Sequence, residues 1–362
     1  MLTSSAAYKI ALRVPHHRVS RFTVRTPDGT LLAQDVPIGG GQVSARLTSR
    51  VTRTATFTTS DEWFPLLATD PLSPFHAIVT IETGLAYPTG EPELFPVFTG
   101  RVYEAVREAE GQITFRADDL AADVLAANFE VPENSVLGMS TVAEIRRLIT
   151  DAYEWAVFGP DDVTDGFVPK LSWDDDRGKA LDDLSTTLEG RWYTLGDGSF
   201  VVRRNNYTGQ PAVITLTDGP AGSLIAARTA ITADGAYNCI VVLAERPDTA
   251  TPIRVTERVL NPSDPAFFGG NFGKRVRKIR SQESLAFLDA QRVARSQLEA
   301  SRALQRQWTA SCVPDMTIEP GDVVGLEWRG LTDTQVIDSL VYPLSPETPM
   351  SFTARSAVDV SV

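Results

Sequence analysis

Two acidic clusters are the first residues whose types and spacing suggest chemistry. The run Asp161-Asp162-Val163-Thr164-Asp165 begins like a calcium loop. However, Val163 stands where a ligand is needed, and Ser172 occupies the position of the bidentate glutamate. The run Asp174-Asp175-Asp176 precedes a helix predicted from Gly178, where carboxylates accept bonds from free backbone N–H groups and favour the helix dipole. We interpret the second run as a helix cap, and neither run as catalytic or metal-binding.

The histidines and cysteines form no recognisable ligand or nucleophile pattern. His16, His17 and His76 have no Cys, Asp or Glu at a metal-ligand spacing. Cys239 and Cys312 each lie in a strand-like apolar run, which favours buried thiols, although a disulfide between them stays open. The sequence also lacks the Gly-x-Ser-x-Gly elbow, the His-Glu-x-x-His zinc helix and a phosphate-binding loop. We predict no catalytic residue, no cofactor and no metal ion.

One basic run stands out against an acidic chain. Lys274, Arg275, Arg277, Lys278 and Arg280 place five positive charges in seven residues. Such a run can contact DNA or an acidic protein surface, and it can equally be a solvated face. The whole chain has 34 basic and 46 acidic side chains, a net charge of −12, which disfavours general nucleic-acid binding and docking on an anionic membrane. The five residues are therefore a candidate partner-contact surface.

Length and composition predict a globular protein of several domains. The 362 residues are 43% apolar, which is enough to fill several cores. The N-terminal residues lack the basic start and apolar stretch of a signal peptide, and no run approaches the roughly 20 apolar residues of a membrane span. We expect a protein made in the cytoplasm that does not enter a membrane by itself.

Residues 1–115 predict short strands separated by turns. In the segment Arg50–Thr58, the period of two places Val51, Arg53, Ala55 and Phe57 on one face and threonines on the other. The glycines at 39–41 precede a strand, and we interpret them as a turn. Short strands at such intervals indicate a small β-barrel or sandwich.

Residues 116–206 predict an α+β domain. Thr141-Val142-Ala143-Glu144 is a capping box for one helix, and a second helix begins near Gly178. Trp192–Leu195 and Ser199–Arg203 flank the turn Gly196-Asp197-Gly198, which predicts a hairpin.

Residues 207–281 and 306–362 return to strands and predict a second small β-barrel. Between them, 282–305 is predicted as one long amphipathic helix, in which Ala290 and Ala294 permit close approach to a sheet. The predicted fold is therefore β-rich α+β, with two β-barrel domains, an intervening α+β domain and one inserted helix.

The order of motifs along the chain resembles the tail-tip or baseplate hub proteins of long-tailed phages. Each motif is weak alone, but together they extend over nearly the whole sequence. The motifs that carry the resemblance are Val19–Val24, Pro27-Asp28-Gly29, Phe98–Val102, Ala117–Leu120, Gly196–Val202, Asn238–Val242, Pro265–Gly273, Ile318–Val324, Val336–Ser339 and Pro343-Leu344-Ser345.

This resemblance implies a structural minor tail protein of the virion, assembled in the host cytoplasm. It implies a homotrimer, in which two related barrels per chain give six pseudo-equivalent positions around a channel. Such a ring would contact the tail tube or distal tail protein ring, the tape measure protein and a central fibre or spike, with DNA passing through only transiently. Many hubs continue into a lysozyme-like, peptidase or fibre domain, whereas this sequence stops at Val362. Wall cutting and receptor binding are then expected of other proteins.

Two other functions remain open from the sequence. A carbohydrate-binding tail adhesin would need an exposed aromatic platform, for which Trp63, Trp155, Trp173 and Trp192 are the candidates. A cell-wall hydrolase is disfavoured by the missing motifs.

Overall fold

The residues of the chain group into two compact units. The computed structural model describes residues 1–88, 90–108, 111–205, 207, 209–220, 222–244, 253–281, 287–301 and 305–356. The first unit comprises 1–206, 210–227 and 309–354, and the second comprises 207–209, 228–308 and the residues from 355 onward. No helix among the described residues is long and apolar enough to span a membrane.

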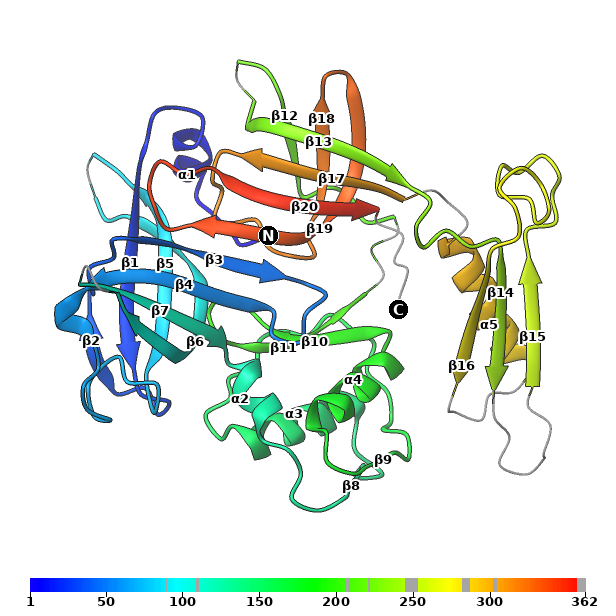
Figure 1. Ribbon diagram of the computed structural model, residues 1–362, viewed down its shortest axis with the longest axis horizontal. Coiled ribbons are helices and arrows are strands. Elements are labelled where there is room, and N and C mark those ends of the chain that lie inside the picture. The colour runs from blue at the N-terminus through cyan, green and yellow to red at the C-terminus, as the bar shows by residue number, and fades with distance from the viewer. Residues whose placement is uncertain are drawn as a thin grey trace. The chain divides into compact units, whose positions relative to one another are not determined.

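One large sheet dominates the first unit (Figure 1). Among the described residues it has thirteen strands, in the order β13-β17-β20-β19-β3-β4-β7-β6-β5-β1-β2, with β18 paired to β19 and β12 paired to β18. These strands are β1 (His17–Arg25), β2 (Leu31–Gln34), β3 (Gly40–Arg46), β4 (Arg53–Ser60), β5 (Ile78–Ala86), β6 (Glu93–Arg107), β7 (Gln112–Asp119), β12 (Ile214–Thr217), β13 (Leu224–Thr232), β17 (Gln305–Cys312), β18 (Val323–Trp328), β19 (Leu331–Pro343) and β20 (Met350–Ser356). A short helix α1 (Ala6–Ala11) precedes β1, and the single turn η1 (Asp61–Trp63) follows β4.

Strand β19 joins the early and late strands of the chain. It pairs antiparallel with β3, which places Val43 opposite Tyr342, and it also pairs with β18. The β-rich α+β class predicted from the sequence is therefore confirmed. The path of this sheet ends at β13 and β2, and no pairing between described strands closes it. The two small barrels, and the domain boundaries drawn around them, stay predictions.

The predicted alternation in β4 is confirmed and explains the sheet's core. Arg53, Ala55 and Phe57 are buried. The Phe57 ring lies 5.0 Å from Phe22 and 5.3 Å from Phe115, measured between centroids. The aromatic side chains of β1, β4 and β7 thus pack against one another.

The glycines at 39–41 do not form the predicted turn. Gly40 and Gly41 belong to β3, where Gly41 has φ of 141°. A Cβ atom at Gly41 would lie 2.2 Å from the carbonyl oxygen of Thr56. These glycines permit β3 and β4 to approach each other closely, which corrects the sequence interpretation.

A helical layer and a hairpin complete the first unit. Helices α2 (Ala121–Ala126), α3 (Thr141–Ala152) and α4 (Arg177–Thr187) accompany the short pair β8 (Glu133–Asn134) and β9 (Ser172–Trp173). The predicted hairpin is confirmed as β10 (Gly190–Thr194) and β11 (Phe200–Arg204). Together they enclose a core whose buried residues include Val124, Ile145, Leu148, Ile149, Leu181, Leu184, Trp192 and Phe200.

The capping residue predicted from the sequence is correct for α4 and wrong by one residue for α3. Asp176 caps α4 as predicted, since its side chain accepts a hydrogen bond from the backbone nitrogen of Lys179 at 2.8 Å. The cap of α3 is Ser140 rather than Thr141, because the Ser140 side chain accepts the bond from Ala143. The predicted capping box is therefore wrong by one residue: Glu144 is buried and is bound by Arg147 instead.

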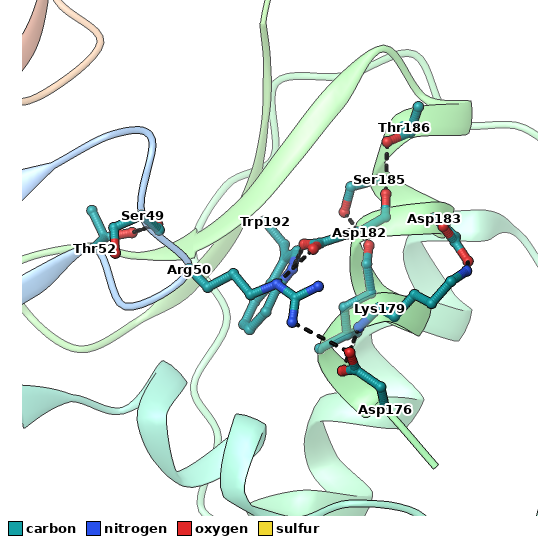
Figure 2. Close-up of polar contacts among 11 residues, drawn as sticks. Ser49, Arg50, Thr52, Asp176, Lys179, Asp182, Asp183, Ser185, Thr186 and Trp192 are labelled. Carbon is teal, nitrogen blue, oxygen red and sulfur yellow. Dashed lines mark hydrogen bonds and ion pairs between the residues drawn. The ribbon is translucent and has the colours of Figure 1, made fainter. Parts of the chain in front are cut away.

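Arg50 connects the turn before β4 to helix α4 (Figure 2). Its Nε atom lies 2.8 Å from the Asp182 carboxylate, and its terminal nitrogen lies 3.5 Å from Asp176. The other oxygen of Asp182 accepts a hydrogen bond from the Trp192 indole at 2.9 Å. Asp182 thereby orients α4 against both the large sheet's turn and the hairpin.

The second unit contains a separate three-stranded sheet. Its strands are β14 (Cys239–Ala244), β15 (Ile253–Arg258) and β16 (Val276–Ser281), in the order β15-β14-β16. Helix α5 (Phe287–Ser301) packs on one face, as Figure 1 shows. The strands predicted for residues 207–281 thus divide between two sheets. The predicted helix ends at 282–286 and 302–304 lie outside the described residues.

The alanine face of α5 gives a direct test of this packing. Ala290 and Ala294 are fully buried against Ile240 and Val242, as the sequence predicted. We expect Ala294→Leu to overpack this contact and lower the free energy of unfolding by ~1–3 kcal/mol in a denaturant titration. The matched control is Val293→Leu at a 37% exposed position, where we expect little change. Equal stability of both variants would contradict this packing.

Candidate interaction surface

The predicted basic run divides between a loop and an edge strand. Lys274 and Arg275 lie in the loop before β16, while Arg277, Lys278 and Arg280 lie in β16 itself. Strand β16 pairs in parallel with β14 and is the last strand on its side of the sheet.

Alternation along β16 sends its cations to different faces. Ile279 packs into the core beneath α5, so Arg277, two residues before it, lies on the helix side. The Arg277 guanidinium lies 5.9 Å from the centroid of the Tyr237 ring. Lys278 and Arg280 are exposed and lie on the face that α5 does not cover.

Strand β15 adds two cations that sequence reasoning missed. Arg254 and Arg258 are exposed, and they alternate with the core residues Ile253 and Val255. They therefore lie on the same face as Lys278 and Arg280. The missed signal was the alternation of apolar and basic residues at 253–258, which lies outside the dense basic run.

The register defines an open basic face with an apolar centre. One row across the sheet contains Arg258, Cys239 and Val276, and another contains Arg254, Leu243 and Arg280. The row between them contains Thr256, Val241 and Lys278. We call this set, with its four cations at 254, 258, 278 and 280, the open basic face.

The loop cations are held in place by aromatic rings and a buried amide. The Phe268 ring lies between Arg258 at 5.1 Å and Lys274 at 5.7 Å, measured to its centroid. The side chain of Asn238, fully buried, donates to the carbonyl of Gly273 at 2.6 Å and accepts from the nitrogen of Arg275 at 2.8 Å. A loop fixed in this way presents its charges without a large ordering cost on binding.

Charge is distributed unevenly between parts of the sequence. Residues 228–308, the main segment of the second unit, contain 13 basic and 8 acidic side chains. The rest of the chain contains 21 basic and 38 acidic side chains. The main segment of the second unit thus has a basic excess within an acidic protein, and the open basic face belongs to it. Residues 1–60 also have a basic excess, with 8 basic and 2 acidic side chains.

The acidic cluster at 161–165 has structural partners. Asp161 binds the backbone nitrogen of Val202 at 2.7 Å, and Asp165 binds the nitrogen of Val142 at 3.1 Å. Asp162 pairs with Arg204, with 2.8 Å between carboxylate oxygen and Nε. Among the described residues, no group of three or more His, Cys, Asp or Glu side chains is arranged to hold a metal ion.

Both cysteines are buried free thiols, as the sequence favoured. Burial raises the pKa of Cys312, and the nearby Asp315 carboxylate raises it further. A thiol with a raised pKa is a poor nucleophile at neutral pH.

The four candidate tryptophans do not gather into a platform. Trp173 and Trp192 are buried, and their indole nitrogens donate to Asp183 at 3.1 Å and Asp182 at 2.9 Å. Trp155 is 45% exposed and packs edge-on against Tyr153. Trp63, in η1, is partly buried. Of the four candidate tryptophans, the adhesin hypothesis thus has one exposed ring instead of a surface.

Comparison with known proteins places the fold among phage tail proteins. No family model matches the sequence, and no curated protein matches it. The structure is similar to a tail protein from Neisseria meningitidis MC58, with a TM-score of 0.66 and 14% identity over 93% of this chain and 95% of that one. It is also similar to the 43 kDa tail protein of prophage MuSo2 from Shewanella oneidensis, with a TM-score of 0.64 and 13% identity over 94% of this chain and 100% of that one.

A third match extends the likeness to another bacterial host. A prophage tail protein from Listeria monocytogenes EGD-e has a TM-score of 0.59 and 10% identity, over 92% of this chain and 94% of that one. At such low identities the likeness is one of fold, and it extends over nearly the full length of each chain. The fold of this protein is therefore that of phage tail proteins, in agreement with the resemblance found in its sequence.

Proposed function

We propose that this chain is a structural hub subunit of a phage tail tip or baseplate. It forms a homotrimer that joins the sixfold tail tube or distal tail ring to a threefold central fibre or spike. It also contacts the tape measure protein and surrounds the channel through which DNA passes. The observation that carries this proposal is the likeness to three tail proteins along more than nine tenths of the chain.

The arrangement of the large sheet supports the pseudo-sixfold part of the proposal. One set of strands, β1 to β7, comes from the first part of the chain, and a second set, β12, β13 and β17 to β20, comes from the later part. The two sets meet at the β3–β19 pairing. In the proposed trimer these sets are the two related barrel-like halves, so that three chains offer six similar positions to a sixfold tube.

The charge distribution supports a channel that does not retain DNA. Outside residues 228–308 the chain has 38 acidic and 21 basic side chains, which favours a neutral or acidic lumen. We propose that Lys274, Arg275, Arg277, Lys278 and Arg280 contact a protein partner and lie away from the lumen.

An electron-microscopy map of an intact particle tests this proposal. We expect three copies on the tail axis, between the last tube ring and a central fibre or spike, around a lumen with few lysines and arginines. Copies off the axis, or a lumen lined by residues 274–280, would contradict it.

A further prediction concerns the absence of enzymatic activity. Asp161, Asp162, Asp165 and Asp176 serve as caps, ion-pair partners or acceptors of backbone hydrogen bonds, so we expect the purified protein to hydrolyse neither peptidoglycan nor common glycans. Zymography on host cell walls checks this. Activity that disappears when a single carboxylate is replaced would favour the hydrolase hypothesis instead.

A further inference from the structure

The open basic face is the side of the three-stranded sheet that α5 does not cover. Helix α5 covers the other side, where Ile240, Val242 and Val255 form the core. Strands β15 and β16 flank β14, so their cations lie about 10 Å apart across the sheet. Val241, between them, is 3% exposed. The apolar centre is therefore buried, and the exposed cations on either side of it supply the contact surface, which suits a partner surface that carries carboxylates.

The same chain contains an acidic surface around the start of α4. Residues 116–206 hold 18 acidic and 9 basic side chains. Arg177 pairs with Asp151 at 2.9 Å, which joins the end of α3 to the start of α4. Asp174, Asp175 and Glu154, next to these residues in sequence, are exposed. We call Asp151, Glu154, Asp174 and Asp175 the acidic patch.

We propose that the open basic face of one copy docks on the acidic patch of a second copy. A closed ring of three requires two different surfaces that complement each other, because its interface is heterologous. The exposed cations of β15 and β16 and the exposed carboxylates of the acidic patch provide such a pair of surfaces. The inference rests on the proposed trimer, and it names the contact between neighbouring subunits.

A second copy is favoured over nucleic acid as the occupant. The Phe268 ring beside these cations is partly buried and already contacts Arg258 and Lys274, so it offers little surface for base stacking. The acidic remainder of the chain repels a phosphate backbone and attracts the basic face of another copy.

The test uses reciprocal charge reversal in the full chain. One variant carries Lys278→Glu and Arg280→Glu, a second carries Asp174→Lys and Asp175→Lys, and a third carries all four changes. All four positions are exposed. Self-association is measured by sedimentation over a range of concentrations. We expect each double variant to weaken it by about a hundredfold, the cost of two close charge pairs, and the fourfold variant to restore it.

The control reverses two exposed cations on another element. Lys9→Glu with Arg13→Glu gives the same change in net charge from α1 and the residues that follow it. We expect this variant to associate like the unaltered protein, apart from a small uniform effect that salt screens.

Zero-length carbodiimide cross-linking identifies the contact itself. Equal amounts of ¹⁴N- and ¹⁵N-labelled protein are mixed, and we expect mixed-isotope peptide pairs that join Lys278 to the segment with Asp174 and Asp175. Pairs of a single isotope only would place the contact within one chain and overturn the inference.

The remaining outcomes separate this inference from the proposed function. Self-association that charge reversal does not change overturns the inference and leaves the hub proposal standing. Binding of duplex DNA that is lost with Lys278→Glu and Arg280→Glu, while self-association persists, also overturns it. A chain that stays monomeric even with its tail-tube partner contradicts the trimer and the inference together.

Discussion

Glu319→Ala is expected to lower the free energy of unfolding by about 3–5 kcal/mol, because it leaves a buried positive charge without its partner. Arg53 is 1% exposed, and its terminal nitrogen lies 2.9 Å from the Glu319 carboxylate. A second nitrogen donates to the carbonyl of Val97 at 3.0 Å, and the guanidinium lies 5.9 Å from the centroid of the Tyr342 ring. Burial acts to lower the pKa of Arg53, but the Glu319 carboxylate outweighs it and the pKa is raised.

A double-mutant cycle separates the pair from its surroundings. Arg53→Met removes the buried charge and supplies an apolar chain of similar length, so the variant with both changes is expected to be more stable than Glu319→Ala alone. Glu327→Ala, at an exposed position on β18, serves as the control. Chemical denaturation measures all four proteins. A loss below about 1 kcal/mol for Glu319→Ala, the scale of exposed pairs, would show that water reaches Arg53.

Lowering the pH from 7 to 4 is expected to stabilise the protein relative to its Asp119→Asn variant by about 2.4 kcal/mol, most of the ~3 kcal/mol that corresponds to two pKa units. Asp119 is fully buried at the end of β7. Its carboxylate accepts hydrogen bonds from the backbone nitrogens of Arg53 at 2.7 Å and Ala121 at 3.1 Å. Burial raises the pKa of Asp119 to about 6, against the hydrogen bonds from Arg53, Thr194 and Ala121, which lower it.

The direction of this stability change follows from whether the folded or the unfolded protein binds the Asp119 proton more tightly. Between pH 4 and 6 the folded protein holds a proton on Asp119 that the unfolded chain, with an ordinary pKa of about 3.9, has released. The stabilising contribution is therefore complete below about pH 3, largely present at pH 4, and lost as the pH rises through 6. Asp119→Asn cannot titrate, so the difference in unfolding free energy between the two proteins isolates this group. A difference that does not vary with pH would contradict a raised pKa.

Local sequence signals predicted the elements well where the signal and the contact lie close together. The hairpin around Asp197 was predicted because turn and strands are adjacent, and Asp176 was identified as a cap from its place before α4. The buried face of α5 followed from its period. The cap of α3 was missed by one residue because Ser140 and Thr141 both fit, and in the structure the Thr141 hydroxyl instead donates to the carbonyl of Gly166.

The sequence did not predict which strands, far apart along the chain, pair with each other. The β3–β19 pairing joins residues about three hundred positions apart, and no local pattern marks which strands become neighbours. The Arg53–Glu319 pair is of the same kind. At the candidate surface, the run from Lys274 to Arg280 was visible as a density of charge. The separation of Arg277 from Lys278, and the addition of Arg254 and Arg258, required the register of β15 and β16 on β14.

The position of the second unit within the chain has a consequence for how such proteins diversify. The chain leaves the large sheet at the end of β13 and returns to it along β17, and these two strands are neighbours in the sheet. The segment between β13 and β17 therefore begins and ends at two neighbouring strands of the large sheet. A segment inserted there can lengthen, shorten or be exchanged at small entropic cost, because loop closure depends only weakly on length. The inserted segment can thus change in length or sequence while the strands of the large sheet keep their pairing.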